Sequence, residues 1–339
     1  MTKDNFFFCI VGYDHPSDRI ISYLKYAPDT VGKWKMDEQP LKRMIPFYSA
    51  ISVQKSLKFL ENYPDYIFND KFNNVKISAV PLTYVKKYYE ADKKIEEIAN
   101  LKKRDALQEK VIALVDYFKD KSGVNRDKFG VTGSILINIH NPKFSDIDLT
   151  IYGVNNAKKI KKTLIMEYDE SKRIKQFKSN HEIENWIKRK TEQFNFNKKI
   201  AKIILSRQWS FGYFDDTRFS IHPIKEIKNI NNNYGNEQCK YLGLAKIRAM
   251  IKDSNNSMFL PSKYVIEDVE IIKGKKSENL NQIISYEGIY SNIVENGEKI
   301  ESYGKLEEVF DLKTKSKYQR LLIGSYEAKG NDYMIPIDF

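Results

Sequence analysis

A strand-like segment with two alternating aspartates is the feature that most limits how this chain can fold. Residues 146–152 read DIDLTIY. Because successive side chains of a strand point to opposite faces, Asp146 and Asp148 share one face, and the isoleucine and leucine side chains share the other. The apolar face would anchor the strand in a sheet. The two carboxylates would repel each other unless a cation lies between them, and hard oxygen ligands of this kind suit Mg²⁺.

A glycine–serine pair precedes the aspartates. Eleven residues separate Gly133-Ser134 from Asp146, and the pair ends a short strand-like run, FGVT. Glycine lets a phosphate approach the backbone closely, and a serine hydroxyl can hold phosphate oxygens together with the N–H groups of a helix start. Each part alone is weak evidence, because charged strand faces are common and Gly-Ser pairs are typical of turns. In a strand–helix–strand context, the parts together predict a phosphate cradle that faces a divalent-metal site.

This conjunction resembles the nucleotidyltransferase superfamily, which includes DNA polymerase beta, poly(A) polymerases and CCA-adding enzymes. With GYDHP at residues 12–16, the stretch FGVTGS…NPKFSDIDLTIYG also resembles a group of archaeal predicted nucleotidyltransferases. The resemblance implies that Gly133 and Ser134 bind the nucleotide, and that Asp146 and Asp148 are catalytic and bind metal. It implies Mg²⁺ (or Mn²⁺) as cofactor and an NTP as substrate. A nucleoside monophosphate would move to a hydroxyl acceptor, and pyrophosphate would leave.

One position departs from the superfamily pattern. These enzymes use a third carboxylate on a later strand, and the corresponding stretch here, residues 218–224, reads RFSIHPI. Ser220 stands where the aspartate is expected. Substitute ligands would be Asp215 or Asp216 in the adjoining turn, or His222, which shares a face with Ser220, although a lone histidine beside proline is more often structural. The departure leaves the nucleotide-side metal site intact and puts activation of the attacking hydroxyl in doubt.

Competing functions therefore stay open. The first is a metal-dependent nucleotidyltransferase. The alternative is a catalytically weakened protein of the same fold that binds nucleotide or nucleic acid. A third reading, an antitoxin-like or scaffold partner, fits the additional domains but has no specific sequence support. The discriminating observation is an acid that lies close enough to the aspartate pair to share a metal ion.

A formal net charge of +12 favours polyanionic partners, and RNA or DNA is a candidate acceptor. The competing interpretation is that much of the lysine is solvated surface. Arg207, Arg218 and Lys225 are candidates for neutralising phosphate, and basic residues of an exposed hairpin are the alternative. Tyrosines of the C-terminal part would suit base stacking, although strand tyrosines more often pack at a sheet edge. These are Tyr264, Tyr286, Tyr290, Tyr303, Tyr318, Tyr326 and Tyr333.

The pattern of the whole chain predicts an α+β fold in which a nucleotidyltransferase-type mixed-sheet core is flanked by two other domains. Residues 1–85 alternate strand and helix signals and indicate an N-terminal α/β domain. Residues 86–122 read as one charged connecting helix with a break near Lys102. The core occupies residues 123–239. Short strands at residues 240–339 predict a small β domain, either a barrel or a sandwich.

Composition narrows the cellular setting. Of 339 residues, 41% are hydrophobic and 30% are charged, and no apolar run reaches the ~18 residues that cross a bilayer. The run from Phe6 to Val11 is too short for a signal peptide, so we expect a cytoplasmic protein without membrane contact. Cys9 and Cys239 are too few and too far apart for a disulfide framework or a zinc cluster. Nothing in the pattern selects a base, an acceptor or an oligomeric state.

Overall fold

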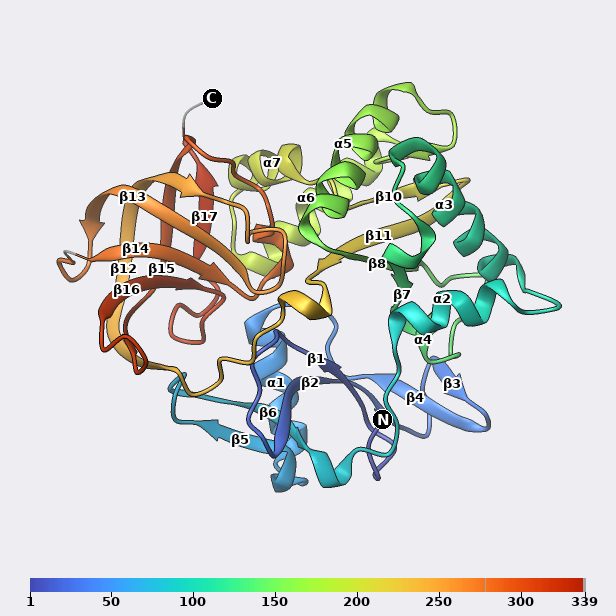
Figure 1. The fold of residues 1–339 in the computed structure, drawn as a ribbon, viewed down its shortest axis with the longest axis horizontal. Coiled ribbons are helices and arrows are strands. Elements are labelled where there is room, and N and C mark those ends of the chain that lie inside the picture. The colour runs from blue at the N-terminus through green and yellow to red at the C-terminus, as the bar shows by residue number, and fades with distance from the viewer. Residues whose placement is uncertain (278, 338–339) are drawn as a thin grey trace.

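The structure is a computed structural model that describes residues 1–277 and 279–337, so Glu278 and the last two residues of the predicted C-terminal domain lie outside the described part. It contains three sheets (Figure 1). The N-terminal sheet, in blue, lies below the other two. The second sheet and its helices, largely green, lie at the upper right, and the third sheet, in orange, lies at the left.

The N-terminal sheet is entirely antiparallel, with the order β3-β4-β2-β6-β5 and with β1 paired to β2. Its elements are β1 (Phe7–Ile10), β2 (Arg19–Pro28), β3 (Trp34–Met36), β4 (Gln39–Arg43), β5 (Ile67–Asp70), β6 (Val75–Pro81) and helix α1 (Ala50–Leu60). Helix α1 begins at Ser49, whose side chain accepts a hydrogen bond from the amide of Ser52. Leu57 and Leu60 of α1 share a buried cluster with Leu24 of β2, so the helix covers one face of the sheet.

Two helices follow where the sequence suggests one connecting helix. They are α2 (Ala91–Ala99) and α3 (Ala106–Ser122). Asp105 begins α3 in a capping box with Gln108, and Gly123 ends it in the left-handed conformation. Ile95 and Phe118 of these helices lie in the same buried cluster as the second sheet. The segment therefore packs against the second sheet as a layer of its core and does not simply connect two domains.

The second sheet has the order β7-β8-β11-β10-β9. Strands β8 and β11 are parallel and the other pairs are antiparallel, which confirms the predicted mixed sheet. Its strands are β7 (Phe129–Val131), β8 (Ile147–Tyr152), β9 (Ile174–Lys175), β10 (Phe211–Phe214) and β11 (Thr217–Ile224). The helices of this region are α4 (Gly133–Leu136), α5 (Val154–Glu170), α6 (Asn180–Phe194) and α7 (Lys198–Arg207). Ile147, Leu149 and Ile151 are fully buried in the core, so the aspartate face of β8 is turned the other way.

The third sheet closes into a barrel. Its order is β12-β13-β14-β16-β15-β17, and β12 also pairs with β15, while β14 and β16 run parallel. The strands are β12 (Glu237–Asp253), β13 (Ser262–Lys273), β14 (Leu280–Ser285), β15 (Lys299–Asp311), β16 (Lys317–Ile323) and β17 (Tyr333–Pro336). Trp186 and Phe194 of α6 and Ile204 of α7 share a buried cluster with barrel residues such as Ile247. Helices α6 and α7 therefore cover the barrel core.

Short 3₁₀ helices complete the connections. They are η1 (Pro64–Tyr66), η2 (Leu82–Tyr84), η3 (Arg126–Lys128), η4 (Ile227–Asn229) and η5 (Gly288–Tyr290). Across residues 1–277 and 279–337, no helix combines the length and the apolar character that a membrane crossing requires.

Candidate active site

The parallel pairing of β8 and β11 places Ser220 directly beside Asp148. The Ser220 hydroxyl donates a hydrogen bond of 2.5 Å to Oδ1 of Asp148. Nε2 of His222 lies 2.8 Å from the same hydroxyl and 3.8 Å from that carboxylate oxygen. Because the serine proton is directed to Asp148, Nε2 of His222 must donate to the serine oxygen. The three side chains form one hydrogen-bonded chain on the open face of the sheet.

The Gly133 turn lies against the carboxylate of Asp148. Gly133 has a φ of +69°, and a Cβ atom built there would lie 2.2 Å from Oδ2 of Asp148. Glycine is therefore required both by the backbone conformation and by the close approach. The amide of Thr132 also donates to the carbonyl of Asp148 at 2.8 Å. The adjacent Ser134 is 8% exposed. The structure thus brings Gly133, Ser134 and Asp148 together.

The two aspartates have different electrostatic surroundings. Burial and the neighbouring charge of Asp148 raise the pKa of Asp146. Burial also works against ionisation of Asp148, yet the hydrogen bond and charge of His222 and the charge of Lys25 hold the pKa of Asp148 well below its usual range. Asp148 is therefore a stable anion, and a cation between the two carboxylates would relieve the repulsion that Asp146 experiences.

A cavity of about 530 Å³ lies in front of these side chains. Ser134, Asp146 and Asp148 line it from the second sheet. Strands β2 and β4 of the N-terminal sheet contribute Lys25 and Arg43 to the same cavity. Its volume is within the range of ligand sites, roughly 300–1,000 Å³. The sequence pattern does not predict this contribution, because no motif spacing links residues that lie about a hundred positions apart in the chain.

Comparison with known proteins identifies the segment that carries the site. Residues 111–210 match the nucleotidyltransferase domain family. The chain contains a nucleotidyltransferase domain. An uncharacterized protein of the archaeon Methanocaldococcus jannaschii is 28% identical over 98% of this chain and 96% of its own length, which agrees with the archaeal resemblance. No solved structure gives a significant match.

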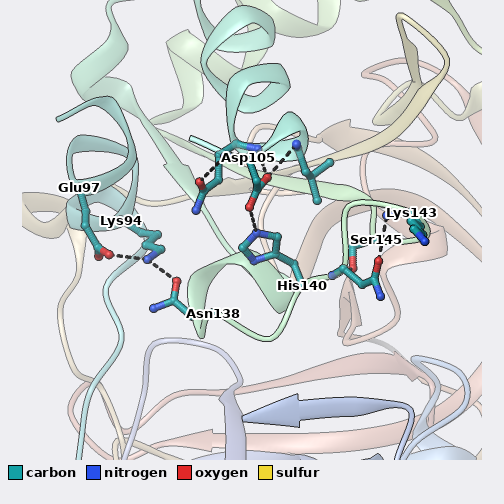
Figure 2. A network of polar contacts seen from close by, with 10 residues as sticks. Lys94, Glu97, Asp105, Asn138, His140, Lys143 and Ser145 are labelled. Carbon is teal, nitrogen blue, oxygen red and sulfur yellow. Dashed lines mark hydrogen bonds and ion pairs between the residues drawn. The ribbon is translucent and has the colours of Figure 1, made fainter. Parts of the chain in front are cut away.

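In the nucleotidyltransferase domain, two polar contacts hold the loop that joins α4 to Asp146 (Figure 2). Nζ of Lys94, on α2, lies 2.7 Å from Oδ1 of Asn138 and 2.7 Å from Oε1 of Glu97. Nε2 of His140 lies 2.8 Å from Oδ2 of Asp105, the residue that caps α3. Helices α2 and α3 therefore position the connection between the Gly-Ser turn and the two aspartates. No sequence motif marks these contacts, because each joins residues that are distant in the chain.

The proposed substitutes for the third carboxylate lie in the turn between β10 and β11. Asp215 forms an ion pair with Arg173 at 2.5 Å. Asp216 lies 3.3 Å from Lys178 and is largely exposed, although it lines the same cavity as the aspartate pair. Among the residues that the structure describes, no three side chains of aspartate, glutamate, histidine or cysteine are grouped so that they could hold a metal ion. A third ligand is therefore not identified by geometry.

The three basic candidates for neutralising phosphate lie in different surroundings. Arg218 lines the cavity beside the aspartates. Arg207 pairs instead with Glu298 of the barrel region at 2.8 Å, and Lys225 lies over the ring of Tyr13 at 5.1 Å. Of these three side chains, Arg218 is the one that lines the cavity with Asp146 and Asp148.

Most of the tyrosines considered for base stacking are engaged elsewhere. Tyr264 and Tyr290 are fully buried in the barrel core, so the stacking hypothesis is wrong for both. Tyr264 lies on β13 and is buried because barrel strands turn alternate side chains inward, whereas Tyr290 ends the 3₁₀ helix η5 and packs into the same cluster. Tyr318 and Tyr333 donate hydrogen bonds to glutamates at 2.9 Å and 2.8 Å. Tyr286 is 45% exposed, so its ring is still accessible for base stacking.

Proposed function

We propose that this protein is a metal-dependent nucleotidyltransferase that moves a nucleoside monophosphate from an NTP to a hydroxyl acceptor. One observation carries the proposal. The Asp148 carboxylate lies against the Gly133 turn, and Ser134 and Asp146 line the same cavity. A phosphate cradle and a pair of carboxylates therefore face one space. The match of residues 111–210 to nucleotidyltransferase domains supports the reaction class.

The residues present fit one divalent cation. Asp146 and Asp148 offer carboxylate oxygens, which suit Mg²⁺ or Mn²⁺, and the open cavity leaves room for phosphate oxygens and water to complete the ligand set. When bound, the ion would neutralise charge that develops on the phosphates during displacement. A second ion would lack an anionic ligand from Ser220.

The chain's own groups would orient the reaction. The Gly133 turn and Ser134 would hold the phosphate tail, so that the acceptor hydroxyl attacks the α-phosphorus in line with the leaving group. The new oxygen–phosphorus bond forms as the α–β bridging bond breaks, and pyrophosphate leaves with the electron pair. The hydroxyl proton passes to solvent or to a nearby base. Arg218, at the cavity wall, would offset negative charge.

A specific observation also favours the weakened alternative. Ser220 occupies the strand position beside Asp148, and its hydroxyl is already bonded to that carboxylate. In this reading the protein binds nucleotide through one ion and transfers slowly or not at all. Both readings predict nucleotide binding, and they differ in the rate of transfer.

Two features support a nucleic-acid acceptor. Strands β12-β13-β14-β16-β15 close back onto β12 with a parallel β14–β16 pair, which is the arrangement of the OB-fold, a barrel that often binds oligonucleotides. The chain also carries a formal net charge of +12. The fold-level similarity supports the class of acceptor by analogy.

The test is a transfer assay. The full chain is incubated with each labelled NTP, Mg²⁺ or Mn²⁺, and either RNA, single-stranded DNA or no acceptor. We expect metal-dependent label transfer in the wild type and none in Asp148→Asn. Metal-dependent NTP binding without transfer would favour the weakened alternative. Absence of both binding and transfer would exclude the proposed function.

A further inference from the structure

The wall of the cavity that faces the aspartates comes from the N-terminal sheet and is basic. We infer that Arg43 and Lys25 form the second half of the triphosphate site and bind the β- and γ-phosphates opposite the Gly133-Ser134 turn. The inference rests on the proposed function and assigns a ligand-binding role to a region outside the segment that matches nucleotidyltransferase domains.

Arg43 carries an unused donor. It ends β4 and lines the cavity, and its Nε is buried without a hydrogen-bond partner among the described residues. Its guanidinium lies 5.0 Å from the ring centre of Tyr48, which holds the planar group in place. A buried N–H without a partner costs free energy, and a bound phosphate oxygen would supply that partner. A guanidinium is also well shaped for phosphate oxygens.

Lys25 stands beside it on the adjacent strand. Strands β2 and β4 pair antiparallel, with Tyr26 opposite Arg43, so Lys25 is next to this pair. Its ammonium lies 5.6 Å from the ring centre of Tyr48 and close enough to Asp148 to influence that carboxylate. One aromatic ring thus arranges both cations on the side of the cavity that faces the metal-binding carboxylates.

The charge of the cavity matches a nucleotide with its ion. Its described lining has five cations and three carboxylates, which leaves a positive surplus. The cations are Lys25, Lys33, Arg43, Lys143 and Arg218. A nucleoside triphosphate stays negatively charged after it binds one divalent cation. A terminal phosphate that reaches the N-terminal sheet would therefore be neutralised from both walls.

The experiment measures equilibrium binding of a non-hydrolysable NTP analogue with Mg²⁺ to the full-length chain. Arg43→Met and Lys25→Met are expected to weaken binding about tenfold or more, because each removes a charge-assisted contact. Binding of the corresponding nucleoside monophosphate should change much less. Lys42→Met is the matched control, because Lys42 is the neighbour of Arg43 on β4, is exposed and pairs with Asp29. It should bind like the wild type.

Further arms separate the outcomes. Arg43→Lys keeps the charge but removes the buried Nε donor, so it should bind the NTP analogue with intermediate affinity. It replaces Arg43→Met as the test if circular dichroism shows that Arg43→Met does not fold. Equal NTP binding by the wild type and both Arg43 variants would overturn this inference and leave the proposed function intact. If the Arg43 and Lys25 variants lose binding of a single-stranded oligonucleotide but bind NTP like the wild type, the basic wall binds the acceptor. This result would also overturn the inference. A wild type that binds no NTP would overturn both.

Discussion

Ser220 and Asp148 lie side by side on parallel strands, and the serine hydroxyl donates a hydrogen bond of 2.5 Å to Oδ1 of the aspartate. His222 contacts the same hydroxyl. At the place where the resemblance to nucleotidyltransferases implies a third carboxylate, the chain therefore has a hydroxyl that is already engaged. A carboxylate at this position would face the same open side of the sheet as Asp148.

Replacing Ser220 with aspartate is therefore expected to strengthen catalysis. The new carboxylate would stand in register with Asp148 and supply an anionic ligand for a second ion. We expect transfer to rise about tenfold or more, which corresponds to roughly 1.4 kcal/mol of added transition-state stabilisation. Two quantities are measured. One is the rate of label transfer, and the other is the number of bound Mn²⁺ ions, which electron paramagnetic resonance detects.

Ser206→Asp is the control for this substitution. Ser206 is exposed on α7, so the variant adds the same negative charge away from the cavity. It should leave both readouts unchanged. Fast wild-type transfer that survives simultaneous replacement of Asp215, Asp216 and His222 would instead show that the third ligand lies elsewhere.

Gly133→Ala should displace the Asp148 carboxylate and abolish Mg²⁺-dependent NTP binding. The added Cβ would lie 2.2 Å from Oδ2 of Asp148, at a φ of +69°. Gly123→Ala is a closely matched control, because Gly123 has a φ of +70° and nothing within 4 Å of an added Cβ. Both variants should lose about 1 kcal/mol of stability from backbone strain. Isothermal titration calorimetry that finds equal nucleotide affinity in the two would contradict the predicted contact.

Asp105→Ala is expected to lower the free energy of unfolding by about 1–2 kcal/mol. The side chain caps α3 and also contacts His140, in the loop that leads to Asp146. Asp127→Ala is the comparison, because Asp127 is exposed and pairs only with its neighbour Lys128, a contact that contributes little. Urea unfolding monitored by circular dichroism measures both. Similar losses in the two variants would argue against a stabilising cap.

Glu287 should make stability fall as pH rises from the ordinary glutamate pKa of 4.5 to about 8. Burial and the charge of Asp332 raise the pKa of Glu287 to about 8. Between the ordinary glutamate pKa and this one, the folded state holds a proton that the unfolded state has lost. Stability therefore decreases with pH, by about 1.4 kcal/mol per pH unit at most. Oε1 accepts a hydrogen bond from the amide of Ala50, while Oε2 is buried and has no hydrogen-bond partner among the residues that the structure describes.

Glu287→Gln keeps the contact to Ala50 and removes the titration. The variant should therefore show a flatter dependence of unfolding free energy on pH between 5 and 8. Denaturant unfolding at several pH values is the measurement. Parallel curves for the variant and the wild type would show that Glu287 does not titrate in this window.

The local geometry of the site could be predicted from the sequence, and its far wall could not. The alternation in β8 predicts that Asp146 and Asp148 share a face, because strand periodicity is a local property. The position of Ser220 beside the aspartates is implied by the resemblance of residues 218–224 to the strand that carries the third carboxylate in nucleotidyltransferases. Arg43 meets these residues only through the packing of the N-terminal sheet, which no local pattern encodes.

The barrel also shows that a local sequence pattern does not determine which side chains are buried. Short alternating strands predict a β domain, but periodicity does not say which face of each strand is turned inward. Tyr264 is a candidate for base stacking or for packing at a sheet edge by its sequence, and in the structure it is a core residue. The capping box of Asp105 and Gln108 starts helix α3 and is encoded locally in the sequence, whereas the apolar spacing of residues 86–122 predicts one long helix.

The cover that α6 and α7 provide for the barrel has a consequence for synthesis of the chain. Trp186, Phe194 and Ile204 leave the ribosome well before β12 begins. The barrel closes only after β16 has been made, because β16 lies between β14 and β15. Most of the second sheet's cluster is already complete by Ile221. A nascent chain at this stage holds an almost finished second sheet with its helices, and the apolar face of α6 and α7 is still uncovered. That interval is where a chaperone would bind, and where slow translation would favour aggregation.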